Sequence, residues 1–383
     1  MKNSEGASNR RIAVGIGARE GGYLLVSDRE RMKWKKVGPF LKGESVNCLK
    51  YDGKSETLFA ATHTNGVFVS KNLGKTWNQM NNGLHVKKTW TLESARNRPS
   101  SIYVGTQYGH VFHSKDLGAN WEEVSGLFTA PKRNEWGVDW GFGTVGLCIH
   151  TIRMDPKKNE RFYIVSSGGG PYRTEDGGKT WSLLNKGVID GCPLPDARAD
   201  LWGLGTSDPE KNLQKHLPEV HKCTHKLVVS RKREGTLYQQ NHCGVYRSVD
   251  FGESWEDISP SENRRHGFPL ALIEDGNEEG SLFTIPAYRA GQCKKHNSCI
   301  MGELAVYRSQ NGGKDWEKLA KGLPKKNHTC VLRDAMAAGD VDSAGLYFGT
   351  TTGEVYGSTD LGENWSLLLE GAGRVQGIFS FHI

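Results

Sequence analysis

Short apolar runs, separated by turns rich in glycine, asparagine and aspartate, recur along the whole chain. One unit contains the runs Ile149–Met154, Phe162–Ser166 and Pro171–Thr174, followed by a turn and a tryptophan. Runs this short that are rich in β-branched and aromatic residues predict strands rather than helices. No run approaches the length of about 18 apolar residues that a membrane-spanning helix needs. The pattern therefore predicts an all-β fold of antiparallel strands.

A repeated motif punctuates these strands. Its form is Ser-x-Asp-x-Gly-x-x-Trp, with Thr in place of Ser in one copy and Asn in place of Asp in two. Ser27 and Trp34 keep only the ends of a seventh copy, at the same separation. Seven of the eleven tryptophans therefore occupy one position of a repeat. The six fuller copies are 70–77, 114–121, 174–181, 248–255, 309–316 and 358–365.

The chemistry of this motif is that of a β-hairpin. A strand such as Gly244–Ser248 ends in a tight turn, in which the Asp or Asn side chain bonds to the local backbone. The glycine supplies a positive φ, and the tryptophan folds back under the turn as an apolar plug. We therefore predict a structural role for the aspartates of the motif rather than a catalytic one.

The spacing of the repeat predicts a closed ring. Successive motif tryptophans are 43, 44, 60, 74, 61 and 49 residues apart, which fits one four-stranded propeller blade per unit, with insertions. The first repeat unit has room for only three strands, at 11–17, 23–27 and 35–38. One extra strand, 374–383, follows the last unit. We expect this C-terminal strand to become the innermost strand of the first blade. The prediction is a single domain, 1–383, folded as a seven-bladed β-propeller of four-stranded antiparallel blades.

Composition narrows the functional classes. The net charge is +7, but 50 Lys and Arg residues are interleaved with 43 Asp and Glu residues, so no nucleic-acid-binding groove is expected. The start of the chain lacks the apolar segment of a signal peptide, and no membrane association is expected. Eight cysteines in 383 residues are too few for a disulfide-stapled domain. These features predict a cytoplasmic protein with mostly free thiols.

The repeated motif resembles the Asp-box, or BNR, repeat. That repeat occurs in sialidases, xyloglucanase-type glycoside hydrolases, sortilin-like receptors and a photosystem assembly factor with a seven-bladed propeller. The resemblance covers nearly the whole chain and implies the propeller fold, whereas these families differ widely in function. The stretch 238–248, YQQNHCGVYRS, is also similar to bacterial Asp-box proteins labelled glycosyl hydrolase or exo-sialidase.

Three long segments interrupt the repeat, at 125–146, 186–222 and 288–303. In a four-stranded blade, the connections between blades emerge on the same face as the turns between second and third strands. We call this the top face, where each inner strand begins, and the Asp boxes lie at the opposite end. All three insertions are expected on the top face, where they would wall a basin over the central channel.

Polar residues recur where the predicted inner strands begin and the second strands end. A purely structural strand end is more often apolar or small. Imidazole, amide and guanidinium groups at one level therefore predict a polar pocket. The predicted substrate-binding residues at these ends are His63, Tyr108, Asn241, Tyr288, Arg289 and Arg333.

A Cys-x-His doublet opens two adjacent inner strands, at Cys148 and His150 and at Cys223 and His225. The i,i+2 spacing places both side chains of a doublet on one strand face. With His242 on the neighbouring strand, His150 and His225 could hold a divalent transition metal such as zinc. The alternative is that the cysteines are small apolar core residues and that the histidines are simply hydrogen-bonded.

An enzyme acting on a glycan would need two carboxyl groups over the basin, one as acid and one as base or nucleophile. The insertions supply Asp139 and Asp200 as the preferred pair, with Glu219 as a further candidate. Trp136 and Trp140, on either side of Asp139, offer flat faces for sugar rings. The competing interpretation is that these acids are solvated loop residues.

Three functional hypotheses remain. The first is a hydrolase or lyase acting on a glycan or small polar substrate in the top-face pocket, and the second adds a metal held by the histidines. The third is a non-enzymatic binding or assembly propeller. Conventional sialidase activity is not expected, because the Phe/Tyr-Arg-Ile-Pro motif of that family is reduced to the string Phe283-Thr-Ile-Pro286 and falls late in the chain. Xyloglucanase-like enzymes carry two propellers, and this chain has room for one.

Overall fold

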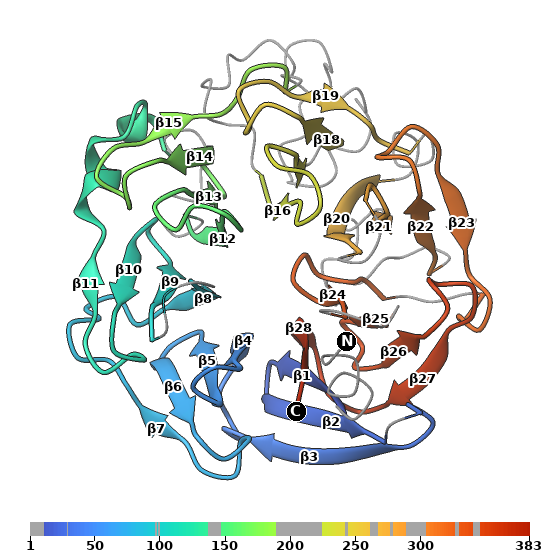
Figure 1. The fold of residues 1–383 in the computed structure, drawn as a ribbon. Helices are drawn as coiled ribbons and strands as arrows, with labels where there is room; N and C mark the ends of the chain where they lie inside the picture. Colours follow the sequence, from blue (N-terminus) through green and yellow to red (C-terminus); the bar gives the residue numbers. More distant parts are fainter. Residues whose placement is uncertain are drawn as a thin grey trace, which may run out of the picture.

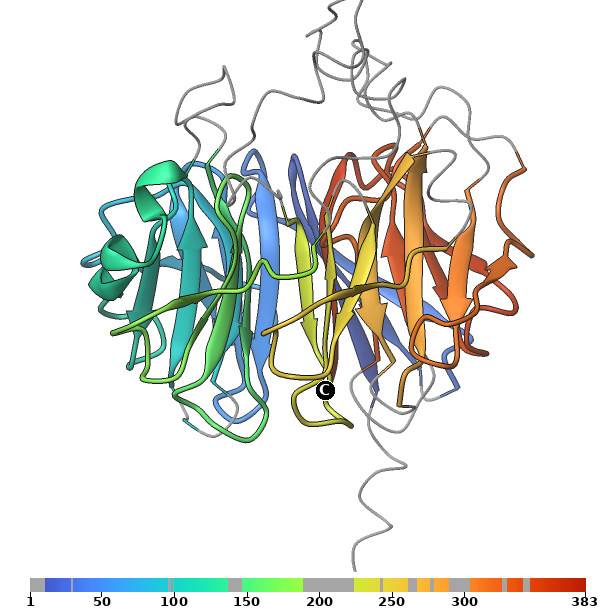
Figure 2. The same cartoon turned by 90° about the horizontal axis from the view of Figure 1, so that it is seen from above.

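A computed structural model shows the chain as a ring of seven four-stranded antiparallel sheets around a central channel (Figure 1). Seen from the side of the ring, the strands run roughly along the channel axis (Figure 2). The prediction of an all-β, seven-bladed propeller is confirmed. The structure describes residues 11–28, 30–95, 98, 100–136, 147–188, 224–241, 244–260, 267–275, 279–288, 304–325, 329–339 and 345–383, with the backbone alone at 267–270 and 287–288.

The blades follow one another in chain order. Blade one contains β28 (Val375–His382), β1 (Ile12–Ala18), β2 (Gly21–Ser27) and β3 (Trp34–Phe40). Blade two contains β4 (Val46–Asp52), β5 (Thr57–Thr62), β6 (Gly66–Ser70) and β7 (Asn78–Gln79). Blade three contains β8 (Thr89–Ser94), β9 (Ile102–Thr106), β10 (Val111–Ser114) and β11 (Glu122–Glu123). Blade four contains β12 (Ile149–Met154), β13 (Phe162–Ser166), β14 (Gly170–Thr174) and β15 (Ser182–Leu183).

The remaining blades keep the same order from the channel outward. Blade five contains β16 (Lys226–Val229), β17 (Leu237–Gln240), β18 (Val245–Ser248) and β19 (Glu256–Asp257). Blade six contains β20 (Gly267–Glu274), β21 (Leu282–Tyr288), β22 (Val306–Ser309) and β23 (Glu317–Leu319). Blade seven contains β24 (Met336–Ala338), β25 (Leu346–Gly349), β26 (Val355–Ser358) and β27 (Ser366–Leu369).

The C-terminal strand closes the ring, as the strand count predicts. β28 pairs antiparallel with β1, in a register that runs from Ile12 opposite His382 to Ala18 opposite Val375 (Figure 1). The first blade is therefore built from strands near both ends of the described chain. This closure leaves each blade between two neighbours, so that no sheet of the ring has an unprotected face.

The Asp boxes form the predicted hairpin turns. In blade three, the Ser114 hydroxyl accepts a hydrogen bond from the Gly118 N–H at 2.8 Å and donates one to Asp116 at 2.8 Å. Asp116 also accepts from the Asn120 N–H at 2.8 Å. The Trp121 indole donates to the Met80 carbonyl of blade two at 2.9 Å. The motif thus closes its own turn and also ties its blade to the preceding one.

A second link between blades lies in the connection that leads from the outer strand of one blade to the next blade. The Asn82 carbonyl accepts a hydrogen bond from the Trp121 N–H at 2.9 Å. The following Gly83 has a φ of +81°, and a Cβ there would lie 2.1 Å from the Trp121 carbonyl oxygen. Gly187 and Gly322 meet the motif tryptophans of blades five and seven in the same way. Glycine is required at these positions because the backbones touch.

Hydrophobic cores lie between the facing sheets of neighbouring blades. For example, Phe59 and Val69 of blade two pack with Leu92, Val104 and Trp121 of blade three. Burial against neighbouring blades explains why second strands such as β5 (TLFAAT) and β13 (FYIVS) are nearly continuous apolar runs. The described part of the chain contains no helix with the length and apolarity needed to span a lipid bilayer.

Only part of the first predicted insertion is described. Residues 125–136 form two short 3₁₀ turns, η1 (Ser125–Thr129) and η2 (Arg133–Glu135), along the outer part of the ring between blades three and four (Figures 1 and 2). This portion therefore covers the flank of the ring. Residues 137–146, 189–223 and 289–303, which make up most of the predicted basin wall, lie outside the described residues.

Candidate functional site

Five side chains meet where the inner strands begin, and we call them the channel-mouth cluster: His63, Trp90, His150, His225 and Arg333. Trp90 on β8 lies at the centre, with its ring 5.7 Å from His63 and 6.1 Å from His150, both edge-on. The imidazoles of His150 and His225 lie 5.1 Å apart. The Arg333 guanidinium lies 5.1 Å from the Trp90 ring centre, a cation–π contact.

The structure thus gathers four of the predicted site residues from blades two, four, five and seven. Each reaches the mouth for a local reason. His63 follows the end of β5, His150 is the second residue of β12, and His225 directly precedes β16. Arg333 lies in the turn before β24. The central residue, Trp90, was not predicted; its only signal in the sequence is that it is a tryptophan outside the Asp boxes at the start of an inner strand.

Two donors in this cluster are buried without a hydrogen-bond partner among the described residues. They are the Trp90 Nε1–H and the Arg333 Nε–H. An unmade hydrogen bond to a buried donor costs about 1–3 kcal/mol, so such donors are uncommon in folded proteins. The Arg333 Nε lies 3.8 Å from the Asp334 carboxylate, within ion-pair range but too far for a hydrogen bond. Two unused donors in one cluster are what a site for an oxygen-bearing ligand would provide.

Positive charge accumulates at the same end of the channel. Burial, followed by the neighbouring Lys88 ammonium, lowers the pKa of His63, so that this imidazole is neutral at pH 7. Burial also lowers the pKa of Arg374, and the nearby charges of Arg19 and Arg333 act in the same direction. Like charges held this close favour the binding of an anion.

Cys148 contacts His150 at the mouth, with Sγ 3.4 Å from Nδ1. Burial raises the pKa of the Cys148 thiol to about 11, although the Arg333 charge acts against this shift. The side chain is therefore a neutral thiol at physiological pH and a poor nucleophile. A bound metal would change this, because coordination deprotonates a thiol.

Below the mouth, the channel holds a cavity of about 200 Å³ whose charges are paired. The Glu93 carboxylate accepts hydrogen bonds from Lys50 at 3.2 Å and from Arg153 at 3.1 Å. The buried Lys226 ammonium lies 2.5 Å from the Asp334 carboxylate. Because Lys50 and Arg153 share one carboxylate, the cavity keeps some positive charge of its own, in addition to that at the mouth.

Other predicted residues have different surroundings. Trp136 is 5% exposed and donates its indole N–H to the Tyr172 hydroxyl at 2.9 Å, so it packs against blade four and we withdraw it as a sugar-stacking residue. Asn241 is buried and accepts the Gly244 N–H at 3.0 Å within its turn. Tyr108 is 38% exposed, with the Lys88 ammonium 5.9 Å from its ring centre.

Several predicted residues lie outside what the structure describes. They include all three proposed catalytic carboxylates and the third proposed metal ligand. They are Asp139, Trp140, Asp200, Glu219, His242 and Arg289, together with the side chain of Tyr288.

No protein-family model and no curated protein matches the chain. Among solved structures, it is similar to the GH74 xyloglucanase from Xanthomonas campestris, with 16% identity over 94% of this chain and 53% of that one, and a TM-score of 0.62. A GH74 enzyme from Niastella koreensis gives 15% identity, 95% and 65% coverage, and a TM-score of 0.54. YCF48 bound to a D1 peptide gives 15% identity, 98% and 93% coverage, and a TM-score of 0.52.

These similarities show the fold alone. The chain spans between 38% and 65% of the length of the GH74 structures it matches. The propellers that it resembles include glycoside hydrolases and a peptide-bound protein, so the fold does not select a function. A functional assignment therefore has to rest on the chemistry of the channel mouth.

Proposed function

We propose that the channel mouth binds a small polar substrate with an anionic group, such as an acidic sugar or glycan end, and that the protein is a hydrolase or lyase. The observation that carries this proposal is the pair of buried N–H groups without a hydrogen-bond partner, on Trp90 and Arg333. The Arg333 Nε lies 3.8 Å from the Asp334 carboxylate, too far for a hydrogen bond. Both N–H groups can donate to the oxygens of one anionic group, and the charges of Arg19 and Arg374 lie nearby. Desolvated donors of this kind bind anions more strongly than exposed ones.

The neighbouring imidazoles supply the chemistry. His150 and His225 lie side by side, and imidazole transfers protons near neutral pH. In a metal-assisted form, His150, His225 and His242 would hold a zinc-like ion, which polarises a substrate oxygen or activates water when bound. In a metal-free form, Asp139, Asp200 and Glu219 remain the proposed acid and base.

The binding step can be tested by calorimetry with glucuronate and galacturonate, using glucose as the neutral comparison. We expect the acids to bind and Arg333→Met to weaken binding by about 10-fold or more, because a charged hydrogen bond is lost. Arg233→Met is the matched control, because Arg233 is 61% exposed and pairs with Glu279 away from the mouth. Equal affinity of wild type and Arg333→Met would contradict the assignment of the site.

A binding or assembly module is the second candidate. The observation that favours it is the near full-length match to the peptide-bound YCF48 structure, which is covered over 98% of this chain and 93% of that one. Turnover decides between the two. Release of reducing ends or of unsaturated product from acidic glycans, lost in His150→Ala, would establish the enzyme. Binding that depends on Arg333 without any turnover would favour the module.

A further inference from the structure

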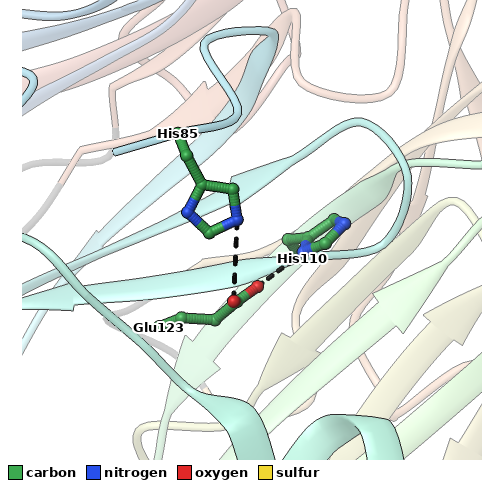
Figure 3. A group of neighbouring side chains, drawn as sticks. All are labelled: His85, His110 and Glu123. Carbon is green, nitrogen blue, oxygen red and sulfur yellow. Dashed lines mark hydrogen bonds and ion pairs between the residues drawn. The ribbon is translucent and has the colours of Figure 1, made fainter. Parts of the chain in front are cut away.

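A second group of chemically active side chains lies on the outer rim of blade three, away from the channel. His85 lies in the connection that enters this blade, His110 lies just before β10, and Glu123 lies on β11 (Figure 3). Their ligand atoms all lie within 4.8 Å of one another, a feature that no other group of three His, Cys, Asp or Glu side chains shows in the described ranges. We call this group the rim triad.

The carboxylate is shared between the two imidazoles. One oxygen of Glu123 lies 2.5 Å from His110 Nδ1, and the other lies 3.6 Å from His85 Nε2. The imidazole rings lie 5.8 Å apart and nearly perpendicular, so both nitrogens point toward the carboxylate rather than toward each other (Figure 3). All three donors therefore face a common space.

We propose that the rim triad binds a divalent transition metal of the zinc type. Two imidazoles and one carboxylate form the ligand set of many open zinc sites. Ligands about 2.0–2.1 Å from a tetrahedral ion lie about 3.3 Å from one another. The distance of 3.6 Å between His85 Nε2 and one Glu123 oxygen is close to this spacing. The distance of 2.5 Å between His110 Nδ1 and the other Glu123 oxygen would have to open by less than 1 Å.

The surroundings hold the ligands in place but leave one side open. His85 packs edge-on against Phe112 at 4.8 Å, and His110 packs against Phe128 at 5.3 Å. The His85 side chain is 59% exposed, whereas His110 and Glu123 are 21% and 24% exposed. Three protein ligands at a partly exposed position leave at least one coordination position for water or for an external ligand. This site is distinct from the proposed metal at the channel mouth.

The test is to titrate zinc into chelator-treated protein and to measure its binding by calorimetry. We expect wild type to bind zinc at this site. His85→Ala and Glu123→Gln should each weaken this binding by at least about 30-fold, because even a substitution of a residue that only hydrogen-bonds to a metal ligand lowers metal affinity by about 10- to 100-fold. His85→Ala removes an exposed side chain, so it should fold normally. Glu122→Gln is the matched control, because Glu122 lies next in sequence on the same strand and instead pairs with Lys115 at 3.0 Å.

Cobalt separates this site from any at the channel mouth. The visible spectrum of a cobalt ion held by the rim triad should persist in the His150→Ala/His225→Ala variant, which removes two of the three proposed ligands at the mouth. Loss of the spectrum in His85→Ala, with retention in Glu122→Gln, would confirm the site. Absence of zinc binding in wild type, or unchanged zinc affinity in both His85→Ala and Glu123→Gln, would overturn the proposal.

Discussion

His113 on β10 is a histidine that burial keeps neutral. Its ring stacks on Tyr103 at 4.1 Å and lies 2.7 Å from the Ser101 hydroxyl. Burial, followed by the Lys115 charge, lowers its pKa to about 4, against an ordinary value of 6.5. The unfolded chain therefore takes up this proton first as the pH falls. The stability that a neutral His113 provides is lost between about pH 6.5 and pH 4.

We expect this loss to be about 1–2 kcal/mol, after discounting for the partial exposure of the ring. It can be measured by urea denaturation at pH 7 and pH 4.5. His113→Phe keeps an aromatic ring over Tyr103 but cannot titrate, so its free energy of unfolding should depend less on pH than that of wild type. An identical pH dependence in the two proteins would refute the assignment.

Individual residues show where prediction from sequence succeeds and where it stops. His150 and His225 could be placed together because the repeat aligns adjacent inner strands, and the structure puts their rings 5.1 Å apart. Trp136 could not be placed, since its burial against Tyr172 depends on the path of an irregular segment. The rim triad could not be found either, because it joins three elements of blade three whose side-chain directions no periodicity gives.

At the scale of single elements, Gly83 tests the backbone link between blades. Its φ is +81°, and an added Cβ would lie 2.1 Å from the Trp121 carbonyl oxygen. Gly43 has a similar φ of +89°, but nothing lies within 4 Å of its missing Cβ. The two glycines thus share the left-handed backbone and differ only in the space available.

Gly43→Ala should cost about 1–2 kcal/mol, the usual penalty for a left-handed residue. Gly83→Ala should cost roughly 3 kcal/mol or more, because the backbones of two blades must also move apart. Urea denaturation of both variants measures the difference. Equal costs would mean that the contact between Gly83 and Trp121 does not constrain the fold.

The residue pattern of single elements explains why the strands could be predicted and why the contact between Gly83 and Trp121 could not. A strand such as β13 is marked by a run of β-branched and aromatic residues, and the Asp box fixes the turn after β14 in the same blade. The turn at Gly83 has no pattern of its own, because glycine marks any tight turn. Its partner, Trp121, lies in the next blade and becomes visible only when the blades are assembled.

At the scale of the whole molecule, the closure of the ring could be predicted from the sequence, whereas the pairing of charges in the channel could not. Closure followed from counting strands, because three strands at one end of the chain and one at the other make a single blade. The charge pattern did not follow, because the pairing in the channel joins residues that lie far apart in sequence. Lys226 of blade five and Asp334 of blade seven are 108 residues apart and meet across the channel. Such pairs offset part of the positive charge that lines the channel.

The pair of Lys226 and Asp334 gives a test at this scale. The Lys226 side chain is 6% exposed, and burial lowers its pKa while the Asp334 charge opposes that shift. Asp334→Asn would leave a buried ammonium without its counter-charge and should destabilise the fold by about 3–5 kcal/mol. Adding Lys226→Met to this variant should recover much of the loss, because the buried ammonium is then removed as well.

The pH dependence provides an independent readout. In Asp334→Asn the folded-state pKa of Lys226 should fall further below that of the unfolded chain, because the opposing Asp334 charge is gone. The unfolded state then binds more protons, so the stability of this variant should rise with pH relative to wild type. Urea denaturation at pH 7 and pH 9 should therefore show the deficit of Asp334→Asn shrinking. The double variant should show no such change, and a deficit in Asp334→Asn that stays constant with pH would mean that the ion pair across the channel does not stabilise the ring.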